Sequence, residues 1–133
     1  MLSITSEDAY VFAESLGFSI AYYQEIACKN PYYGYLYAKN IIEADIKKCQ
    51  EAACKSSCWA YSFAKDIEGA DIGKCQEAAC KEFKYAYWFA KNIKGADIKY
   101  CQKSACRDPK WAIKFAEDIP GADKKKCLIY SIL

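Results

Sequence analysis

The chain has 133 residues, which is enough for one compact domain and too few for two ordinary ones. Hydrophobic residues make up 53% and charged residues 27%, which excludes a compositionally disordered chain, and a formal net charge of +2 indicates no particular partner. No apolar run approaches the roughly 18 residues of a membrane span, and the acidic start MLSITSEDAYVFAES is unlike an ordinary secretory signal. We therefore expect a soluble, cytoplasmic protein without a membrane partner.

A 26-residue repeat organises the chain. It is visible in two columns of cysteines, Cys28, Cys54, Cys80 and Cys106, and Cys49, Cys75, Cys101 and Cys127. We predict a single repeat domain over residues 1–133, with repeats at 4–29, 30–55, 56–81, 82–107 and 108–133. The first copy aligns with the others only if its turn at Gly17-Phe18 is one residue shorter.

The first half of each repeat carries a helical pattern. In DPKWAIKFAEDI (108–119), the apolar residues Trp111, Ala112, Phe115, Ala116 and Ile119 recur at the spacing of one helix face. Asp108 is a good N-cap and Pro109 suits the first helical position. Asn30-Pro31 repeats this device in the second repeat.

The second half of each repeat begins after a turn such as PGAD (120–123), in which we expect Gly to end one helix and Asp to cap the next. The predicted caps are Asp45, Asp71, Asp97 and Asp123, with Ser19 in the first copy. In IKKCQEAAC the apolar face holds Ile46, Cys49 and Ala53, and Gln50 and Cys54 lie on its flank.

Ten short helices in five antiparallel pairs follow from this pattern. Helices of about ten residues are marginal alone in water, so each pair must bury a face against the next pair. We predict an all-α fold, a right-handed α-solenoid of five helical hairpins. The arrangement resembles the tetratricopeptide and HEAT class of repeats, although the period is shorter than in either family and the tetratricopeptide Trp/Leu-Gly/Tyr signature is missing.

The nine cysteines are expected to be packing residues. Two cysteines five residues apart on one helix have Cα atoms roughly 8–9 Å apart, and equivalent cysteines of successive repeats stand about one helix spacing apart. Both separations exceed the reach of a disulfide, and the thiols of one helix point to different neighbours. The chain has no His, so we expect no Cys/His zinc site, no His-based catalysis and no cofactor.

Cys58 differs from the other cysteines because Tyr32, Lys84 and Lys110 occupy its place in other repeats. This indicates a solvent-facing position near a helix N-terminus, where a thiolate is favoured. Three interpretations stay open: a reactive thiol, a Cys54–Cys58 pair, or an ordinary exposed cysteine.

A store of Cu(I) ions or a redox protein is a further functional alternative for a cysteine-rich helical chain. Such a store needs several thiols directed at one axis, usually one helical turn apart. The five-residue spacing between Cys49 and Cys54 does not provide this.

Two positions on the first helices are candidates for binding a partner. The first is a column of tyrosines, Tyr10, Tyr35, Tyr61 and Tyr87, which either pack between neighbouring repeats or line a groove. The next position carries Leu36 and Trp88, which we expect to be exposed and therefore to be covered by a partner. The predicted partner-binding residues are Trp88, Leu36, Tyr35, Tyr61 and Tyr87.

A basic column closes the second helices. Its members are Lys29, Lys55, Lys81 and Arg107. Cations at helix C-termini complement the helix dipole, and the same column would also suit phosphates spaced along the stack. Glu51, Glu77 and the near-neutral total charge weaken the second interpretation, so nucleic-acid binding is an alternative function.

The C-terminal segment KKKCLIYSIL (124–133) is apolar on several sides. Solenoids usually end in a polar surface, so Leu128, Ile129, Tyr130 and Leu133 are the predicted interface of a homodimer, unless the helix folds back tightly enough to hide them.

Catalysis has little support in the sequence, which lacks a Gly-rich phosphate loop and a GxSxG motif. The predicted function is therefore non-enzymatic binding of another protein, as a scaffold, an adaptor or a small inhibitor.

Overall fold

The computed structural model describes residues 3–132, and for residues 130–132 it describes the backbone alone. Within this range ten helices and no strands form, which confirms the predicted all-α repeat fold. The helices are α1 (Ser6–Leu16), α2 (Ala21–Ala27), α3 (Pro31–Asn40), α4 (Ile46–Ala53), α5 (Ser57–Asp66), α6 (Ile72–Ala79), α7 (Phe83–Asn92), α8 (Ile98–Ala105), α9 (Pro109–Asp118) and α10 (Lys124–Ile132). The handedness of the stack and the single-domain organisation remain predictions.

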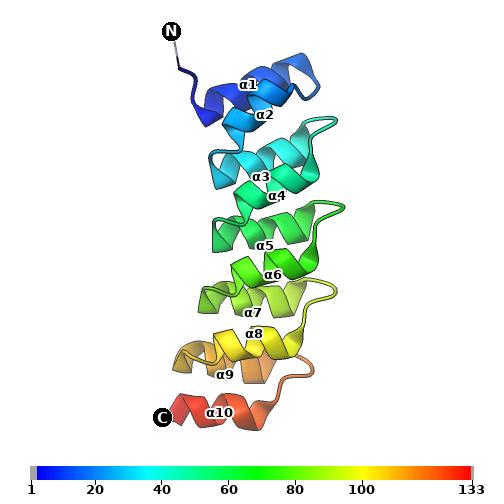
Figure 1. Cartoon of the computed structure of the whole chain (residues 1–133). Helices are drawn as coiled ribbons and strands as arrows, with labels where there is room; N and C mark the ends of the chain where they lie inside the picture. The colour runs from blue at the N-terminus through cyan, green and yellow to red at the C-terminus, as the bar shows by residue number, and fades with distance from the viewer. Residues whose placement is uncertain (1–2, 133) are drawn as a thin grey trace.

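Five helix pairs are stacked one after another along the chain (Figure 1). The loops within the pairs project on one side of the stack, and the tighter turns between pairs lie on the opposite side. Each odd-numbered helix contacts the next odd-numbered helix, from α1 to α9, and each of α2, α4, α6 and α8 contacts the odd-numbered helix that follows it. We call the odd-numbered helices the first helices and the even-numbered ones the second helices.

The predicted aspartate caps hold the starts of the second helices. Asp45, Asp71 and Asp97 are N-caps of α4, α6 and α8, and each side chain accepts a hydrogen bond from a backbone N–H three residues on. Asp123 accepts the N–H of Lys126 at 3.1 Å in the same way. The prediction for Ser19 is wrong: α2 starts after Ile20, and the Ser19 hydroxyl instead lies 2.9 Å from Tyr37 Oη.

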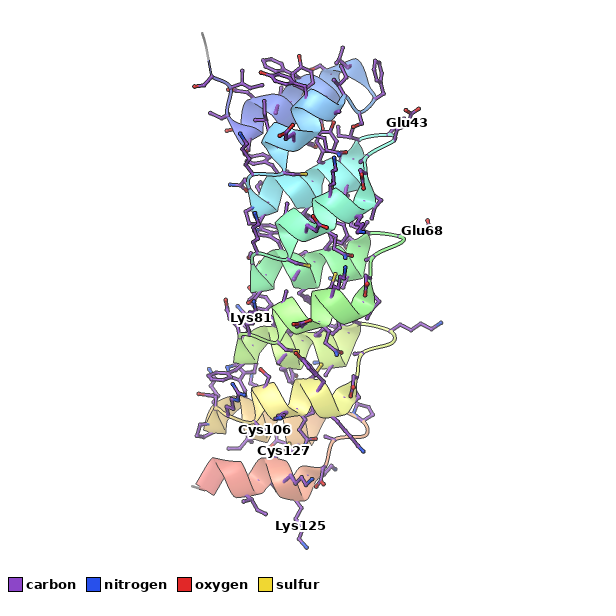
Figure 2. The ribbon with its side chains drawn as sticks, viewed as in Figure 1. Glu43, Glu68, Lys81, Cys106, Lys125 and Cys127 are labelled. Atoms are coloured by element: carbon purple, nitrogen blue, oxygen red, sulfur yellow. The ribbon has the colours of Figure 1, made fainter. Side chains whose placement is uncertain are left out.

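In the last three repeats the glycine of the hairpin loop lies beyond the helix end rather than at it. In α5, α7 and α9 the C-cap is an isoleucine in an extended conformation, and the glycines adopt positive φ two residues later, as in Gly95 at 90°. Only Gly17 is itself a C-cap. Glu43 takes the left-handed position of the second repeat with φ 66°, and its loop projects from the stack like that of Glu68 (Figure 2). The expectation that glycine ends each first helix is therefore wrong for the later repeats.

Two columns of fully buried side chains form the interior. The aromatic column is Tyr37, Phe63, Phe89 and Phe115, and the cysteine column is Cys49, Cys75, Cys101 and Cys127, all at 0% exposure. Burial of these cysteines as packing residues is confirmed. Phe12 stands in the aromatic column of the first repeat, where no earlier pair covers it, and 43% of it is exposed. Full burial of each ring thus depends on the preceding pair as well as on its own hairpin.

The described helices are all short, and none within residues 3–132 is long and apolar enough to cross a membrane.

Candidate functional site

The column of tyrosines lies between repeats rather than at an exposed edge. Tyr35, Tyr61 and Tyr87 are 6%, 9% and 3% exposed, so the structure favours the packing interpretation over a groove lined by these rings. Each phenol bonds the last residue of the first helix in the next repeat. The pairs are Tyr10 with Asn40 (2.8 Å), Tyr35 with Asp66, Tyr61 with Asn92 (2.9 Å) and Tyr87 with Asp118 (2.5 Å).

The surroundings of Tyr35 and Tyr87 favour the neutral form of the phenol. Burial raises the pKa of Tyr35, and its hydrogen bond to the Asp66 carboxylate adds to that effect. The pKa of Tyr87 is raised for the same two reasons, with Asp118 as the carboxylate. Lys39 also contacts the Tyr35–Asp66 pair, because its Nζ lies 3.3 Å from Tyr35 Oη and 4.0 Å from Asp66 Oδ2. Tyr35 and Tyr87 are therefore neutral hydrogen-bond donors between repeats at ordinary pH, whereas Tyr10 and Tyr61 accept from the Asn40 and Asn92 amides.

A second aromatic column runs along the first helices, and we call it the aromatic seam. It consists of Tyr33, Trp59, Tyr85 and Trp111, one residue from each of four repeats, all half-buried. Each ring packs against the tyrosine column of the preceding repeat, with ring centroids 6.0, 5.3, 6.1 and 5.4 Å apart for Tyr10–Tyr33, Tyr35–Trp59, Tyr61–Tyr85 and Tyr87–Trp111. The sequence signal for this column was an aromatic residue every 26 positions, which our sequence analysis did not single out.

Trp88 and Leu36 are half-buried and packed against the core, so the expectation that they are exposed is wrong. The physical reason is that α7 is flanked by α5 and α9 as well as by the second helices, which leaves no face of α7 wholly in water. The Trp88 ring lies 5.2 Å from that of Tyr87. Only part of the Trp88 side chain is therefore open to solvent.

Lysine side chains lie over the rings of the aromatic seam in α7 and α9 and over the ring of Trp88. The Nζ atom of Lys84 lies 5.5 Å from the centre of the Tyr85 ring, and that of Lys91 lies 5.4 Å from the centre of the Trp88 ring. Over Trp111, Lys110 and Lys114 stand at 5.8 and 5.0 Å. The rings thus hold ammonium groups at a partly apolar surface through cation–π attraction.

The basic column lies on the other side of the stack, at the ends of the second helices. Lys29, Lys55, Lys81 and Arg107 are all exposed and follow directly after the C-cap cysteines. Carboxylates accompany them: a hollow of about 440 Å³ between α2 and α4 is lined by Glu25 and Glu51 as well as by Lys48 and Lys55. The exposure expected of this column is present, but the surface carries mixed charge.

Eight of the nine cysteines lie in four pairs that join consecutive second helices. The two thiols of one helix point to different neighbours, as expected, but each of those neighbours is a cysteine, which the sequence analysis did not predict. Each pair joins a C-cap cysteine to a first-turn cysteine 21 residues later. The Sγ–Sγ separations are 3.8 Å for Cys28–Cys49, 4.0 Å for Cys54–Cys75, 3.7 Å for Cys80–Cys101 and 2.7 Å for Cys106–Cys127. Figure 2 labels the last pair, at the end of α8 and in α10. In the sequence, cysteines 5 and 26 residues apart were compared, whereas the cysteines that meet in the structure are 21 residues apart.

In the first two sulfur pairs the two thiols differ in acidity. The hydrogen bond with Cys49 lowers the pKa of Cys28, and the same bond, with burial, raises the pKa of Cys49. Cys54 and Cys75 repeat this asymmetry. In the last pair, burial raises the pKa of both Cys106 and Cys127. In the first two pairs the half-buried outer sulfur therefore ionises more readily than its buried partner.

A row of glutamines runs beside the sulfur pairs. Gln24, Gln50 and Gln76 are buried, and the Oε1 atom of each accepts the backbone N–H of the aspartate cap 21 residues later, at 2.8, 2.7 and 2.7 Å. Gln102 makes the same bond to Asp123 at 2.8 Å. We call these four residues the glutamine row. The sequence signal was a glutamine in every repeat except the last, which our sequence analysis placed on the helix flank.

Cys58 is half-buried rather than solvent-facing. Its thiol is hydrogen-bonded to Tyr85, and this bond, with burial, raises the pKa of Tyr85 to about 12. The sulfur of Cys54 faces Cys75 instead of Cys58. Of the three open interpretations, the Cys54–Cys58 pair is therefore not formed, whereas the reactivity of Cys58 remains a prediction.

The apolar residues predicted for a dimer interface lie only partly within the described side chains. Leu128 and Ile129 on α10 are 46% and 48% exposed, whereas the side chains of Tyr130 and Leu133 lie outside the described residues. Among the residues that the structure describes, no group of three or more His, Cys, Asp or Glu side chains could hold a metal ion.

The two sides of the stack thus differ in chemistry: rings and lysines on the first helices, and thiols, amides and mixed charge on the second. No model of a protein family, no curated protein and no solved structure matches this chain.

Proposed function

We propose that the chain is a non-enzymatic binding solenoid whose first helices dock an acidic segment of another protein. The observation that carries this proposal is the set of half-buried rings on α7 and α9, Tyr85, Trp88 and Trp111, each with a lysine ammonium within 6 Å of its centre. Tryptophan and tyrosine at a partly desolvated surface are the residues most enriched among binding hot spots.

The charge of this surface supports an acidic partner. Lys84, Lys91, Lys110 and Lys114 are exposed, and the only ion pair within the described residues joins Lys39 to Asp66, in the earlier repeats. Two nearby carboxylates have other bonds: Asp118 accepts the Tyr87 phenol and Asp108 caps α9. Glu82, the N-cap residue of α7, makes no side-chain capping bond, and Glu117 on α9 is exposed. Carboxylates of a partner would meet ammonium groups already placed against apolar rings, which favours fast association and a defined register.

This proposal includes the finer roles expected from the sequence. Near-identical units with different outward residues suit a scaffold, an adaptor or a small inhibitor, acting in the cytoplasm. Leu36 and Trp88 contribute the parts of their side chains that remain open to solvent.

A binding titration with defined probes tests the proposal. The probes are a random copolymer of glutamate and tyrosine, a glutamate homopolymer and a single-stranded DNA oligonucleotide, each followed by the fluorescence of Trp59, Trp88 and Trp111. We expect the glutamate–tyrosine copolymer to bind most tightly, and the variant Lys84→Glu/Lys110→Glu to weaken that binding at least tenfold because it reverses charge at the rings.

The matched control reverses charge on the other side of the stack. Lys47→Glu/Lys125→Glu changes two exposed lysines of the second helices by the same total charge and should leave binding of the copolymer nearly unchanged. Equal losses in both double variants, or tighter binding of the oligonucleotide than of the copolymer, would contradict the proposal.

Nucleic-acid binding is the second candidate, because all four residues of the basic column are exposed. It predicts oligonucleotide binding that weakens steeply with salt and that Lys55→Glu/Lys81→Glu abolishes. The glutamates in the adjoining hollow argue for weak binding. No binding at low salt would remove this candidate.

A homodimer through α10 remains part of the proposal, supported by the exposure of Ile129. Two copies would bury this residue in a self-complementary contact. Light scattering at tens of micromolar should give twice the mass of the chain and, for Ile129→Lys, the mass of one chain. A monomer in both samples would contradict it.

A further inference from the structure

The sulfur pairs join second helices that are otherwise connected directly through the bonds of the glutamine row. Each pair joins two consecutive second helices, whose closest packing partners are the first helices beside them. Hollows open between these second helices: one of about 440 Å³ between α2 and α4, one of about 350 Å³ between α6 and α8, and one of about 380 Å³ between α8 and α10. We call the C-cap cysteines of the four pairs, Cys28, Cys54, Cys80 and Cys106, the outer column. A small molecule that enters one of these hollows meets Cys28, Cys80 or Cys106 of this column.

Cations outnumber carboxylates at two of these cysteines. The hollow at Cys80 is lined by Lys81, Lys103 and Arg107 beside Glu77, and that at Cys106 by Lys99, Lys103 and Lys126 beside Asp123. The hollow at Cys28 carries two lysines and two glutamates. The excess of cations at Cys80 and Cys106 favours the approach of an anionic reagent. The half-buried sulfurs of Cys28 and Cys54 are the most accessible of the outer column, whereas Cys80 and Cys106 are 7% and 2% exposed.

We propose that the four sulfur pairs are modification sites at which a small anionic disulfide, such as oxidised glutathione, oxidises each dithiol to a disulfide that ties consecutive second helices together. The inference goes beyond the binding function and does not depend on it. It gives the repeated cysteines a role beyond packing, because the sulfurs face each other at every junction where both columns hold a cysteine.

The reaction proceeds in two exchanges, shown for the first pair. The Cys28 thiolate attacks one sulfur of the reagent, a Cys28–reagent disulfide forms, the S–S bond of the reagent breaks, and the released thiolate takes a proton from water. The Cys49 thiol then loses its proton to solvent, and its sulfur attacks Cys28 Sγ. The mixed disulfide breaks and a second reagent thiolate leaves and is protonated. Two protein thiols have lost two electrons, and the reagent has become two thiols.

Exposure of the outer sulfur sets the expected order of the four reactions. Cys28–Cys49 and Cys54–Cys75 should form first, and the buried pairs later. Each disulfide closes a loop of 21 residue steps without crossing another disulfide. Because such loops restrict the unfolded chain, the oxidised protein should melt roughly 10 °C or more above the reduced protein.

Tryptic mapping without reductant tests the proposal on the native chain. Cleavage after Lys and Arg places Cys49 and Cys54 on one peptide (49–55) and Cys75 and Cys80 on another (75–81). The proposed disulfides then yield two cross-linked species and no others. In the first, peptides 1–29, 49–55, 75–81 and 100–103 are joined by three disulfides. In the second, peptides 104–107 and 127–133 are joined by one.

Two variants sharpen the assignment. Cys28→Ser, at a half-buried position, should release peptide 1–29 and leave the other three peptides of the first species joined. Cys58→Ser is the matched control, because this cysteine lies outside the pairs, and it should leave both species intact.

Three results would overturn the proposal. They are glutathione adducts that never convert to cross-links, disulfides between cysteines at separations other than 21 residues, and a chain that keeps all nine thiols after prolonged exposure to oxidised glutathione.

Discussion

The first and second helices join the repeats by two different kinds of contact. On the first helices a phenol bonds either a carboxylate or an amide, as Tyr87 does with Asp118 and Tyr61 does with Asn92. On the second helices the side-chain oxygen of each glutamine in the row accepts a backbone N–H, and each sulfur pair joins two thiols. The oxygens of Gln50 and Gln76 also accept the thiols of Cys75 and Cys101. The partners of the tyrosines on the first helices therefore vary between Asn and Asp, whereas the second helices repeat the same glutamines and cysteines.

The difference follows from burial. The carboxylate of Asp118 is at the surface, where water can satisfy whatever the phenol does not, so either Asn or Asp fits. The amides of Gln50 and Gln76 are buried, and a buried acceptor that loses its donor is expensive. Constant residues thus indicate the contacts that set the register of the stack.

The largest expected effect comes from a substitution in the buried aromatic column of the interior. Phe89→Ala should lower the free energy of unfolding by about 3–5 kcal/mol, because it empties a fully buried site. Denaturant unfolding under reducing conditions measures the change. Phe12→Ala, the same substitution at the exposed end of the column, should have less than half the effect, and equal losses would contradict burial by the neighbouring pair.

The second-largest effect tests the glutamine row. Gln50→Met keeps the length and helix propensity of the side chain but removes the acceptor of the Asp71 N–H and of the Cys75 thiol. We expect a loss of about 1–3 kcal/mol in the free energy of unfolding, measured by denaturant titration.

The matched control for this substitution is Gln102→Met, at the half-buried member of the same row. Solvent should replace part of the lost bond there, so its effect should be the smaller of the two. A larger loss at Gln102 would show that burial does not decide the strength of these bonds.

A smaller effect is expected on the first helices. Tyr87→Phe removes a hydrogen bond to a surface carboxylate and should lower the free energy of unfolding by about 0.5–1 kcal/mol. Tyr61→Phe removes a bond to the neutral Asn92 and should cost less. Thermal unfolding of both variants tests the ranking, and a loss at Tyr87 above that of Gln50→Met would reverse the comparison of the two rows.

The smallest effect is seen only at alkaline pH. The raised pKa of Tyr85, about 12 against 10.0, means that the folded chain keeps a proton that the unfolded chain loses. The stability that this provides is complete below pH 10 and is lost as the pH rises towards 12. Tyr85→Phe removes the titrating group and should flatten this part of the pH profile of unfolding. Identical profiles for both proteins between pH 10 and 12 would contradict the shift.

Much of the fold could be predicted because its signals are local. Helical spacing, the Asp108-Pro109 start and the aspartate caps each act within one turn of chain, and the 26-residue period added the order of the pairs. Ser19 failed for a tertiary reason, since its hydroxyl is taken by Tyr37 from the next repeat.

The candidate sites were predicted less well because they depend on how neighbouring helices are offset. Helix geometry fixes the five-residue separation of Cys49 and Cys54, but the meeting of Cys28 with Cys49 depends on the tilt between α2 and α4. Trp88 was placed opposite the buried face of an isolated helix, whereas α5 and α9 cover part of that side. The periodicity of the sequence gives the buried face of one isolated helix, whereas the exposure of a side chain also depends on the helices packed beside it.

The hydrogen bonds of the tyrosine column and of the glutamine row, and the contacts of the sulfur pairs, span only 21 to 31 residues of chain. Little loop entropy has to be lost before any of them forms, so a low contact order is built into the architecture. Folding should therefore begin at any interior pair and spread in both directions, at a rate that depends little on how many units follow.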